Sequence, residues 1–90
     1  MEFEYDPEKS KANEAKHGID FEQAKDLWSD DARLVIPARS ESEPRWAVLA
    51  RRRATVWAAF YTLRGSRVRL ISVRRARPNE KAMYESGRAG

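Results

Sequence analysis

The residues best suited to chemistry are the arginines in the second half of the sequence. Between Pro44 and Asn79 the chain has ten arginines, and neither a lysine nor an acidic residue. A solvated surface normally mixes both signs of charge and uses lysine as freely as arginine. Arginine alone favours planar, bidentate recognition of phosphate or carboxylate groups. The pattern therefore predicts contact with nucleic acid, with an acidic protein partner, or with both.

Five of these arginines fall within twelve residues, with no acidic residue among them. If the nucleic acid is an RNA that the protein cleaves without a metal, a base must deprotonate the ribose 2′-hydroxyl and an acid must protonate the leaving 5′-oxygen. Cations stabilise the charge on the phosphorane, and arginine suits this last role. Strict strand alternation would place Arg74 on the opposite face from Arg67, Arg69 and Arg75. We expect catalytic roles for Arg64, Arg74 and Arg75, and RNA-binding roles for Arg67 and Arg69.

The only histidine, His17, lies in the stretch NEAKHGID at residues 13–20. Histidine can accept or donate a proton near neutral pH, so His17 is a candidate catalytic acid or base. A cation in the last turn of a helix also stabilises that helix through its dipole, by about 0.3–1 kcal/mol. The sequence KHG is typical of such a helix end. The structural role is preferred because it needs no further partner, and the catalytic role stays open.

A possible contact face is formed by residues spaced at helical intervals around His17. A polar helix normally turns such a side to solvent, and we prefer this alternative for Lys9. For Asn13 we favour a functional contact, because asparagine is a mediocre helix former with better substitutes. The residues expected to contact RNA or a partner protein are Lys9, Asn13 and Lys16.

Glu80 and Tyr84 lie one turn apart in a predicted closing helix. Glu80 is near the N-terminus of that helix, where the dipole favours a negative charge, and it can pair with Arg74 or Arg75. Tyr84 can pack against a sheet or stack on an RNA base. Both are kept as candidate catalytic residues, with the structural role preferred for Glu80.

Composition bounds the class of protein. The chain has the length and apolar content of one small domain, which we take to span residues 1–90. It has no cysteine, no apolar run long enough for a membrane span and no basic-then-apolar leader, so a cytoplasmic protein is expected. With one histidine and scattered carboxylates, neither a metal site nor a cofactor is expected. Residues 1–31 carry ten acidic residues and four lysines, whereas residues 32–90 carry fourteen basic residues and four acidic ones.

The first half of the chain is predicted to hold a short strand and two helices. The strand is expected at residues 3–6. Asp6-Pro7 begins a helix that ends at Lys16-His17-Gly18, with Ala12 and Ala15 turned inward. Asp20 begins a second helix, where Gln23 completes a variant of the capping box. That helix extends to the segment SDD at 29–31 and buries a stripe of Phe21, Ala24, Leu27 and Trp28.

The second half is predicted to form strands, because it is rich in β-branched and aromatic residues. The first strand is RLVIPA, ended by Pro37, and three longer strands follow, RWAVLARR, TVWAAFYTL and RVRLISVRR. A closing helix is expected in RPNEKAMYES, with Asn79 as its N-cap and Gly87 just past its end. The order β-α-α-β-β-β-β-α predicts an α+β fold with helices packed on a twisted, mainly antiparallel sheet.

Two stretches of the sequence resemble the BrnT family of toxins. They are FEYDPEKSKANEAKHGIDFEQAKDLWSD near the N-terminus and RLISVRRARPNEKAMYES near the C-terminus, together about half of the chain. The pattern FxxDPxKxxxNxxKHGIxFExA is long and specific. The chain departs from the family in its turn ARRRAT, which adds Arg51, Arg52 and Arg53, and the resemblance does not explain these three residues.

The resemblance implies a RelE-like fold and the endoribonuclease toxin of a bacterial type II toxin–antitoxin module. Such a toxin would cleave RNA without a metal and inhibit translation. The resemblance also implies a BrnA-type antitoxin in a toxin–antitoxin heterotetramer, in which the ribbon-helix-helix part of the antitoxin binds operator DNA. Two other classes stay open: a nucleic-acid-binding module without catalysis, and a protein whose arginines only meet an acidic partner.

Overall fold

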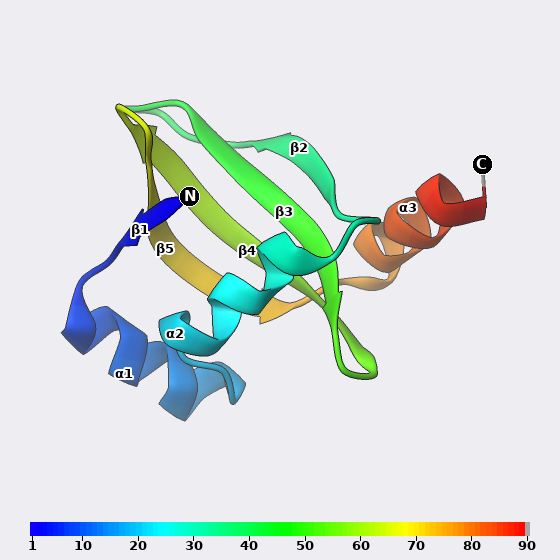
Figure 1. Ribbon diagram of the computed structural model, residues 1–90, viewed down its shortest axis with the longest axis horizontal. Coiled ribbons are helices and arrows are strands. Elements are labelled where there is room, and N and C mark those ends of the chain that lie inside the picture. Colours follow the sequence, from blue (N-terminus) through cyan, green and yellow to red (C-terminus); the bar gives the residue numbers. More distant parts are fainter. Residues whose placement is uncertain (90) are drawn as a thin grey trace.

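The fold combines one sheet with helices on both of its faces (Figure 1). The computed structural model describes residues 1–89, and the side chains of residues 1–87. The α+β class predicted from the sequence is confirmed. In chain order the elements are β1 (Glu2–Glu4), α1 (Pro7–His17), α2 (Phe21–Ala24), the 3₁₀ helix η1 (Lys25–Ser29), β2 (Leu34–Ala38), β3 (Arg45–Arg52), β4 (Thr55–Arg64), β5 (Arg67–Arg75) and α3 (Pro78–Ala89).

The sheet is mixed, with the strand order β1-β5-β4-β3-β2. The short β1 lies parallel to β5 at one edge. The three other pairings, β2 with β3, β3 with β4 and β4 with β5, are antiparallel. Tight turns join β3 to β4 and β4 to β5, which is why these long strands are neighbours in space.

The ends of α1 are fixed by the residues that the sequence indicated. The Asp6 carboxylate accepts a hydrogen bond of 2.9 Å from the backbone N–H of Glu8, and Pro7 follows as the first helical residue. At the other end Gly18 has a φ of 79°, a left-handed conformation that suits glycine, and its N–H donates to the Glu14 carbonyl. Both predicted boundaries of α1 are confirmed.

The inward face of α1 is polar, which corrects the prediction that Ala12 and Ala15 turn inward. Both alanines are exposed, whereas Ser10 and Asn13 are buried. The Ser10 hydroxyl accepts a hydrogen bond of 2.9 Å from the backbone N–H of Phe21. Hydrogen bonds to nearby backbone groups, and not the burial of apolar side chains, therefore determine which face of α1 packs inward.

The second helix is shorter than predicted and changes its winding. Asp20 and Gln23 form the expected capping box, with hydrogen bonds of 2.7 and 3.0 Å. The α-helical part spans only Phe21–Ala24, and the chain continues as η1. This tighter winding still buries Leu27 completely and packs Trp28 at the edge of the core.

A β-bulge in β5 changes which side chains share a face. In the β4–β5 pairing, Phe60 lies opposite Ser72 and Tyr61 lies opposite Leu70, so Ile71 is an extra residue in β5. Beyond the bulge the alternation is shifted by one residue. Arg74 therefore lies on the same face as Arg67 and Arg69, and Arg75 lies on the opposite face. This corrects the arrangement predicted from strict alternation.

The two faces of the sheet are covered unequally. One face of the sheet is covered by α1, α2 and η1, and the large core on this side includes Val48, Trp57 and Val73. The opposite face, which we name the α3 face, carries α3 at one end of the sheet (Figure 1) and a much smaller buried cluster. That cluster consists of Leu49, Val56, Ala58 and Tyr84.

Two further boundaries differ from the sequence prediction. Pro37 lies within β2 and does not end it, because β2 is an edge strand where a missing N–H costs no ladder hydrogen bond on the open side. α3 begins at Pro78 and includes both Asn79 and Gly87, so these residues neither cap nor terminate it. None of the helices described within residues 1–89 is long and apolar enough to cross a membrane.

Candidate nucleic-acid interface

Two of the arginines predicted to bind RNA are paired with the acidic strand β1. Arg67 Nε lies 3.1 Å from Glu2 Oε2, and Arg69 Nη1 lies 2.8 Å from Glu4 Oε2. The parallel register causes this pairing, because it places Glu2 opposite Arg67 and Glu4 opposite Arg69. The carboxylates neutralise much of the charge that these two arginines would offer to a phosphate.

Arg74 is committed to Glu80. Its Nη1 and Nη2 donate to the two carboxylate oxygens of Glu80 at 2.7 and 3.0 Å, and the backbone N–H of Arg77 donates to Glu80 Oε1 at 2.8 Å. The hydrogen bonds from Arg74 hold the pKa of Glu80 below its usual range; burial opposes this, and the N–H of Arg77 adds to it. The predicted pairing of Glu80 with Arg74 is confirmed, and it keeps Glu80 as a carboxylate that anchors α3.

Three exposed arginines without an ion pair in the described chain lie at one end of the sheet. Arg75 is the last residue of β5, and its guanidinium carbon lies 5.9 Å from the centre of the Trp57 ring. Arg77 follows just before α3, and Arg53 occupies the turn between β3 and β4. Trp57 is opposite Arg75 in the sheet, so this turn and the end of β5 are close. We name Arg53, Arg75 and Arg77 the basic end.

Arg53 has an unusual backbone conformation. Its φ is 58°, in the left-handed region that arginine rarely adopts. A turn of this kind is ordinarily made with glycine or asparagine. The conformation presents an exposed arginine at the tip of the hairpin, where no carboxylate of the described residues pairs with it. Backbone strain of this kind is often kept at functional sites.

The C-terminal end of α1 lies toward the same end of the sheet. Glu4, just before α1, is opposite Arg69, and Asn13 within α1 binds the backbone of Val73. α1 and β5 therefore run in the same direction, and the last turn of α1 lies toward Arg75, the last residue of β5. That turn holds Lys16, which is exposed, and His17, which is half-buried. Lys9 is exposed nearer the start of α1.

Arg64 lies at the opposite end of the sheet. It ends β4 and is opposite Arg67 at the start of β5. The residues from Arg67 to Arg75 span about 25 Å at the usual rise of a strand. Arg64 and Arg75 therefore cannot hold the same phosphate, which corrects the prediction of one catalytic set that contains both.

Two other predicted contact residues belong to the scaffold. Asn13 is 7 % exposed, and its side-chain amide donates to the Ile19 and Val73 carbonyls and accepts from the Val73 N–H. Tyr84 is 1 % exposed, and its hydroxyl donates to Asp30 Oδ2 at 2.6 Å. Neither side chain can reach RNA from these positions, because both are enclosed by the protein. The contact predicted for Asn13 and the base stacking considered for Tyr84 are therefore wrong.

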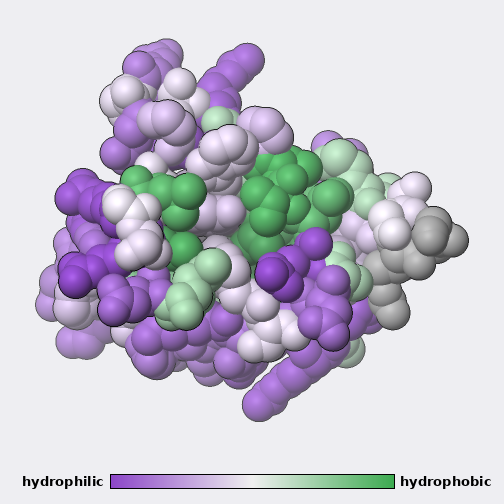
Figure 2. Space-filling view, turned by 45° about the horizontal axis from the view of Figure 1, so that its top comes forward, coloured by the Kyte–Doolittle hydropathy of each residue, from purple (hydrophilic) through white to green (hydrophobic). Residues whose placement is uncertain are grey.

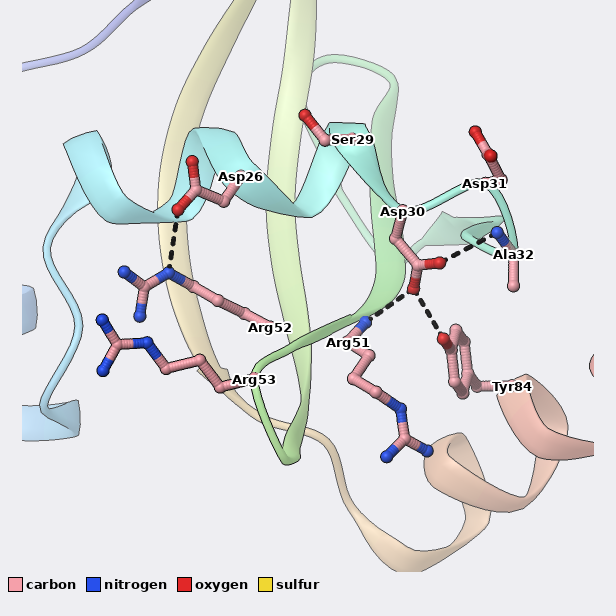
Figure 3. A pocket seen from close by; sticks show the side chains of 9 residues that line it. All are labelled: Asp26, Ser29, Asp30, Asp31, Ala32, Arg51, Arg52, Arg53 and Tyr84. Carbon is pink, nitrogen blue, oxygen red and sulfur yellow. Dashed lines mark hydrogen bonds and ion pairs between the residues drawn. The ribbon is translucent and has the colours of Figure 1, made fainter.

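The three arginines of the ARRRAT turn have three different environments (Figure 3). The backbone N–H of Arg51 donates to Asp30 Oδ2 at 2.9 Å, and its side chain points toward α3. Arg52 Nε pairs with Asp26 Oδ2 at 3.1 Å. The Arg53 side chain extends in the same direction as that of Arg52 in this view, and Arg53 is exposed. Arg53 is therefore the most accessible of the three to a phosphate, while the half-buried Arg51 also makes no ion pair with the described residues and has an Nε without a hydrogen-bond partner.

The hollow around this turn has mixed charge. It has a volume of about 670 Å³ and is bordered by η1, the end of β3 and α3. Three aspartates line it together with the three arginines, so it does not offer a uniformly positive surface. Its lining residues are Asp26, Ser29, Asp30, Asp31, Ala32, Arg51, Arg52, Arg53 and Tyr84.

The sequence prediction gives no role to Arg53 and does not include Arg77, although both belong to the basic end. The absence of acidic residues near them in the sequence could have indicated both. The one exception is Glu80, which is close to Arg77 but pairs with Arg74. The missing information was which arginines the acidic first third of the chain would neutralise. That depends on the parallel pairing of β1 with β5.

The basic end supplies part of what phosphodiester cleavage needs. Its arginines can hold a phosphate and stabilise extra negative charge on it, because none of them forms a direct ion pair with a carboxylate of the described residues. His17 is the one nearby side chain of a type that exchanges protons near neutral pH. Within residues 1–89 no three His, Cys, Asp or Glu side chains are grouped so that they could hold a metal ion.

The sequence was also compared with known proteins. The family model described as "Ribonuclease toxin, BrnT, of type II toxin-antitoxin system" matches residues 5–80. The matched segment includes His17, the whole basic end and the ion pair of Arg74 with Glu80. No curated protein matches the chain.

Proposed function

The chain belongs to the BrnT family of ribonuclease toxins of type II toxin–antitoxin systems, and we propose that its basic end binds RNA and cleaves it internally. The single observation that carries this placement is the set of unpaired arginines Arg53, Arg75 and Arg77. The other arginines of β5 that the sequence singled out are held by carboxylates. A backbone phosphate of RNA would therefore gain most at the basic end.

The proposed reaction is attack of a ribose 2′-oxygen on the adjacent phosphorus. The bond from phosphorus to the 5′-oxygen breaks, the proton of the 2′-hydroxyl passes to a base, and the leaving 5′-oxygen takes up a proton. Arg75 and Arg53 stabilise the charge that accumulates on the phosphorane oxygens. His17 exchanges a proton with the reacting groups, and it contributes less to the rate of cleavage than the arginines do. No metal ion takes part in this scheme.

The wider setting is also proposed from the family. The toxin would inhibit translation in the cytoplasm by cleaving RNA, on a sheet of RelE-like type. A BrnA-type antitoxin would neutralise it in a heterotetramer, and operator DNA would be bound only through the antitoxin. The strongly unequal charge of the two parts of the chain supports an acidic partner.

A cleavage assay tests the proposal. The purified chain is incubated with a defined RNA oligonucleotide, with and without EDTA, and the product ends are identified. We expect internal cleavage that EDTA does not abolish, with 2′,3′-cyclic phosphate or 3′-phosphate ends. Loss of cleavage in EDTA would contradict the metal-independent reaction. Intact RNA that binds with a steep salt dependence would show a binding module without catalysis.

A further inference from the structure

The α3 face of the sheet is only partly covered by the chain itself. α3 shields one end of this face, over the small cluster that contains Leu49 and Tyr84. Next to that cluster, Ile36 and Phe60 remain only partly buried. Ile36 on β2 is opposite Ala47 on β3, and Ala47 is opposite Phe60 on β4. An apolar row therefore crosses three strands and is left open on one side.

The row continues into a groove beside α3. The groove has a volume of about 600 Å³, and Leu34 lines it from β2. Leu34 and Ile36 are two residues apart on β2 and so point to the same face. Ala82 and Met83 line the groove from α3, where Met83 is 39 % exposed. We name the group Leu34, Ile36, Phe60, Ala82 and Met83 the β2–α3 surface.

The space-filling view supports an accessible apolar area at this edge. Figure 2 shows hydrophobic surface gathered over the β2 edge of the molecule, between hydrophilic regions. Val35 in β2 is 47 % exposed but points to the other face of the sheet, since it lies between Leu34 and Ile36. Exposed apolar groups that adjoin one another, with a polar rim, are typical of a protein interaction site.

Two arginines border this surface, of which Arg45 makes no ion pair with the described residues and Arg74 is paired with Glu80. Arg45 lies on the same face of β3 as Ala47, and its Nε is buried without a hydrogen-bond partner in the described chain. The guanidinium carbon of Arg74 lies 5.0 Å from the centre of the Phe60 ring. A buried donor that lacks an acceptor is costly, and because Arg45 as a whole is only half-buried, a carboxylate of a partner can pair with the accessible part of its guanidinium.

These features fit a protein partner better than RNA. The row is largely aliphatic, whereas RNA bases are held by aromatic platforms and free cations. The arginines Arg67, Arg69 and Arg74 on this face are already paired with carboxylates. The occupant should therefore combine an apolar face with acidic residues.

A helix is the favoured form of that occupant. Pro37 interrupts the donors of β2, which disfavours the addition of a partner strand along this edge. The groove beside α3 is lined by the small residues Ala82, Ser86 and Gly87, which allow another backbone to approach closely. An amphipathic helix in a groove is a common mode of recognition.

We propose that the β2–α3 surface is where the antitoxin docks, through an amphipathic helix whose apolar side covers Leu34, Ile36 and Phe60 and whose carboxylate binds Arg45. This inference rests on the proposed function, since it takes the partner to be the antitoxin. In this proposal the partner binds the β2–α3 surface, and RNA binds the basic end. Arg74, which borders Phe60, and Arg75 of the basic end are neighbours in β5 but lie on opposite faces of the sheet.

The test compares matched apolar-to-acid substitutions. Ile36→Glu and Met83→Glu change the proposed surface, and Leu63→Glu is the control, since Leu63 is 54 % exposed at the far end of β4. The probe is the gene product whose co-expression with this chain restores growth. Its affinity for each variant is measured by calorimetry. RNA cleavage and the melting temperature are measured on the free chain.

We expect Ile36→Glu and Met83→Glu to weaken binding of the probe by about 30-fold or more, as at the centre of an interface. Leu63→Glu should change it by less than about threefold, and all three variants should cleave RNA within about twofold of wild type.

If Ile36→Glu lowers the melting temperature strongly, the exposed Met83→Glu and Arg45→Gln decide the question. Unchanged affinity in both of these would overturn the docking site. Impaired RNA cleavage by folded Met83→Glu would also overturn it, because the surface would then serve RNA. A wild-type chain that binds the probe but leaves RNA intact would contradict the proposed function alone.

Discussion

Asn13 ties three parts of the chain together through one side-chain amide. Its Nδ2 donates to the carbonyls of Ile19 and Val73 at 2.8 and 2.9 Å, and its Oδ1 accepts from the Val73 N–H at 3.0 Å. The amide thus joins α1, the loop that follows it and β5. At the residue scale, the polar side chains of α1 that make hydrogen bonds to backbone groups elsewhere in the chain are structural, and the others are exposed or, for His17, half-buried.

Asn13→Ala should destabilise the protein without a direct effect on RNA. The substitution leaves two carbonyls and one N–H buried without partners, which should cost about 2–4 kcal/mol in the free energy of unfolding. Chemical denaturation followed by circular dichroism measures this cost. Lys9→Ala on the exposed side of the same helix is the control and should change stability by less than about 0.5 kcal/mol. Equal stabilities for the two variants would contradict the structural role of Asn13.

His17 ends α1 one turn beyond Asn13. His17→Asn should lower the melting temperature measurably, because a histidine in its protonated form interacts favourably with the dipole at the end of a helix and asparagine does not. Cleavage should fall by less than about tenfold, compared with the 10²–10⁴-fold loss expected when a positioned acid or base is removed. Cleavage rates measured as a function of pH for both proteins check this. A hundredfold loss at an unchanged melting temperature would make His17 a catalytic residue.

α3 is held to the sheet by a small number of specific contacts. Tyr84 packs into the small cluster, and its hydroxyl binds Asp30 in the link between η1 and β2. Glu80 binds the guanidinium of Arg74 and the backbone of Arg77. At the scale of the elements, therefore, the closing helix depends on one ion pair and one tyrosine, whereas α2 and η1 contribute side chains to the large core.

The Glu80 ion pair should make stability depend on pH in the acid range. The folded-state pKa of Glu80 is lowered by Arg74, so its contribution is present above the unfolded-state pKa and is lost as the pH falls through the folded-state value. Glu80→Gln should cost about 1–3 kcal/mol at pH 7. The difference from wild type should shrink below about pH 4.

Denaturation curves at pH 7 and pH 3 measure this difference. Glu85→Gln is the control, because Glu85 is exposed on the same helix. A difference between wild type and Glu80→Gln that is the same at both pH values would show that the charge of Glu80 does not stabilise α3.

Both ends of α1, the start of α2 and the class of fold were predictable, because local residues determine them. Asp6, Gly18 and Asp20 act within a few residues of their own position. The bulge at Ile71 was not predictable, because an extra residue in a strand is fixed by how both partner strands pack. It moved Arg74 and Arg75 to faces other than those expected. The candidate site was affected for the same reason, since the neutralisation of Arg67 and Arg69 depends on contacts between distant segments.

At the scale of the whole molecule, the acidic first third and the basic remainder are not separated in space. Glu2, Glu4 and Asp26 lie against arginines of the sheet and cancel their charge locally. Among the arginines of β5 and the segment that follows it, Arg75 and Arg77 are left without an ion pair to the described residues, and Arg53 lies near them in the β3–β4 turn. The fold therefore places three unpaired arginines together at one end of the sheet, whereas Arg64 stands apart at the other end, and it leaves an apolar surface beside α3 for a partner.

Arg75 and Arg64 give the most direct test that cleavage takes place at the basic end. Both are exposed and make no ion pair with the described residues, and they lie at opposite ends of the sheet. The measurement is the rate of cleavage of one defined RNA by wild type, Arg75→Ala and Arg64→Ala, at equal melting temperatures. Arg75→Ala should lower the rate by about 10²–10³-fold, as expected when a group that stabilises transition-state charge is removed. Arg64→Ala should stay within about threefold of wild type. An unchanged rate for Arg75→Ala, or a larger loss for Arg64→Ala, would contradict cleavage at the basic end.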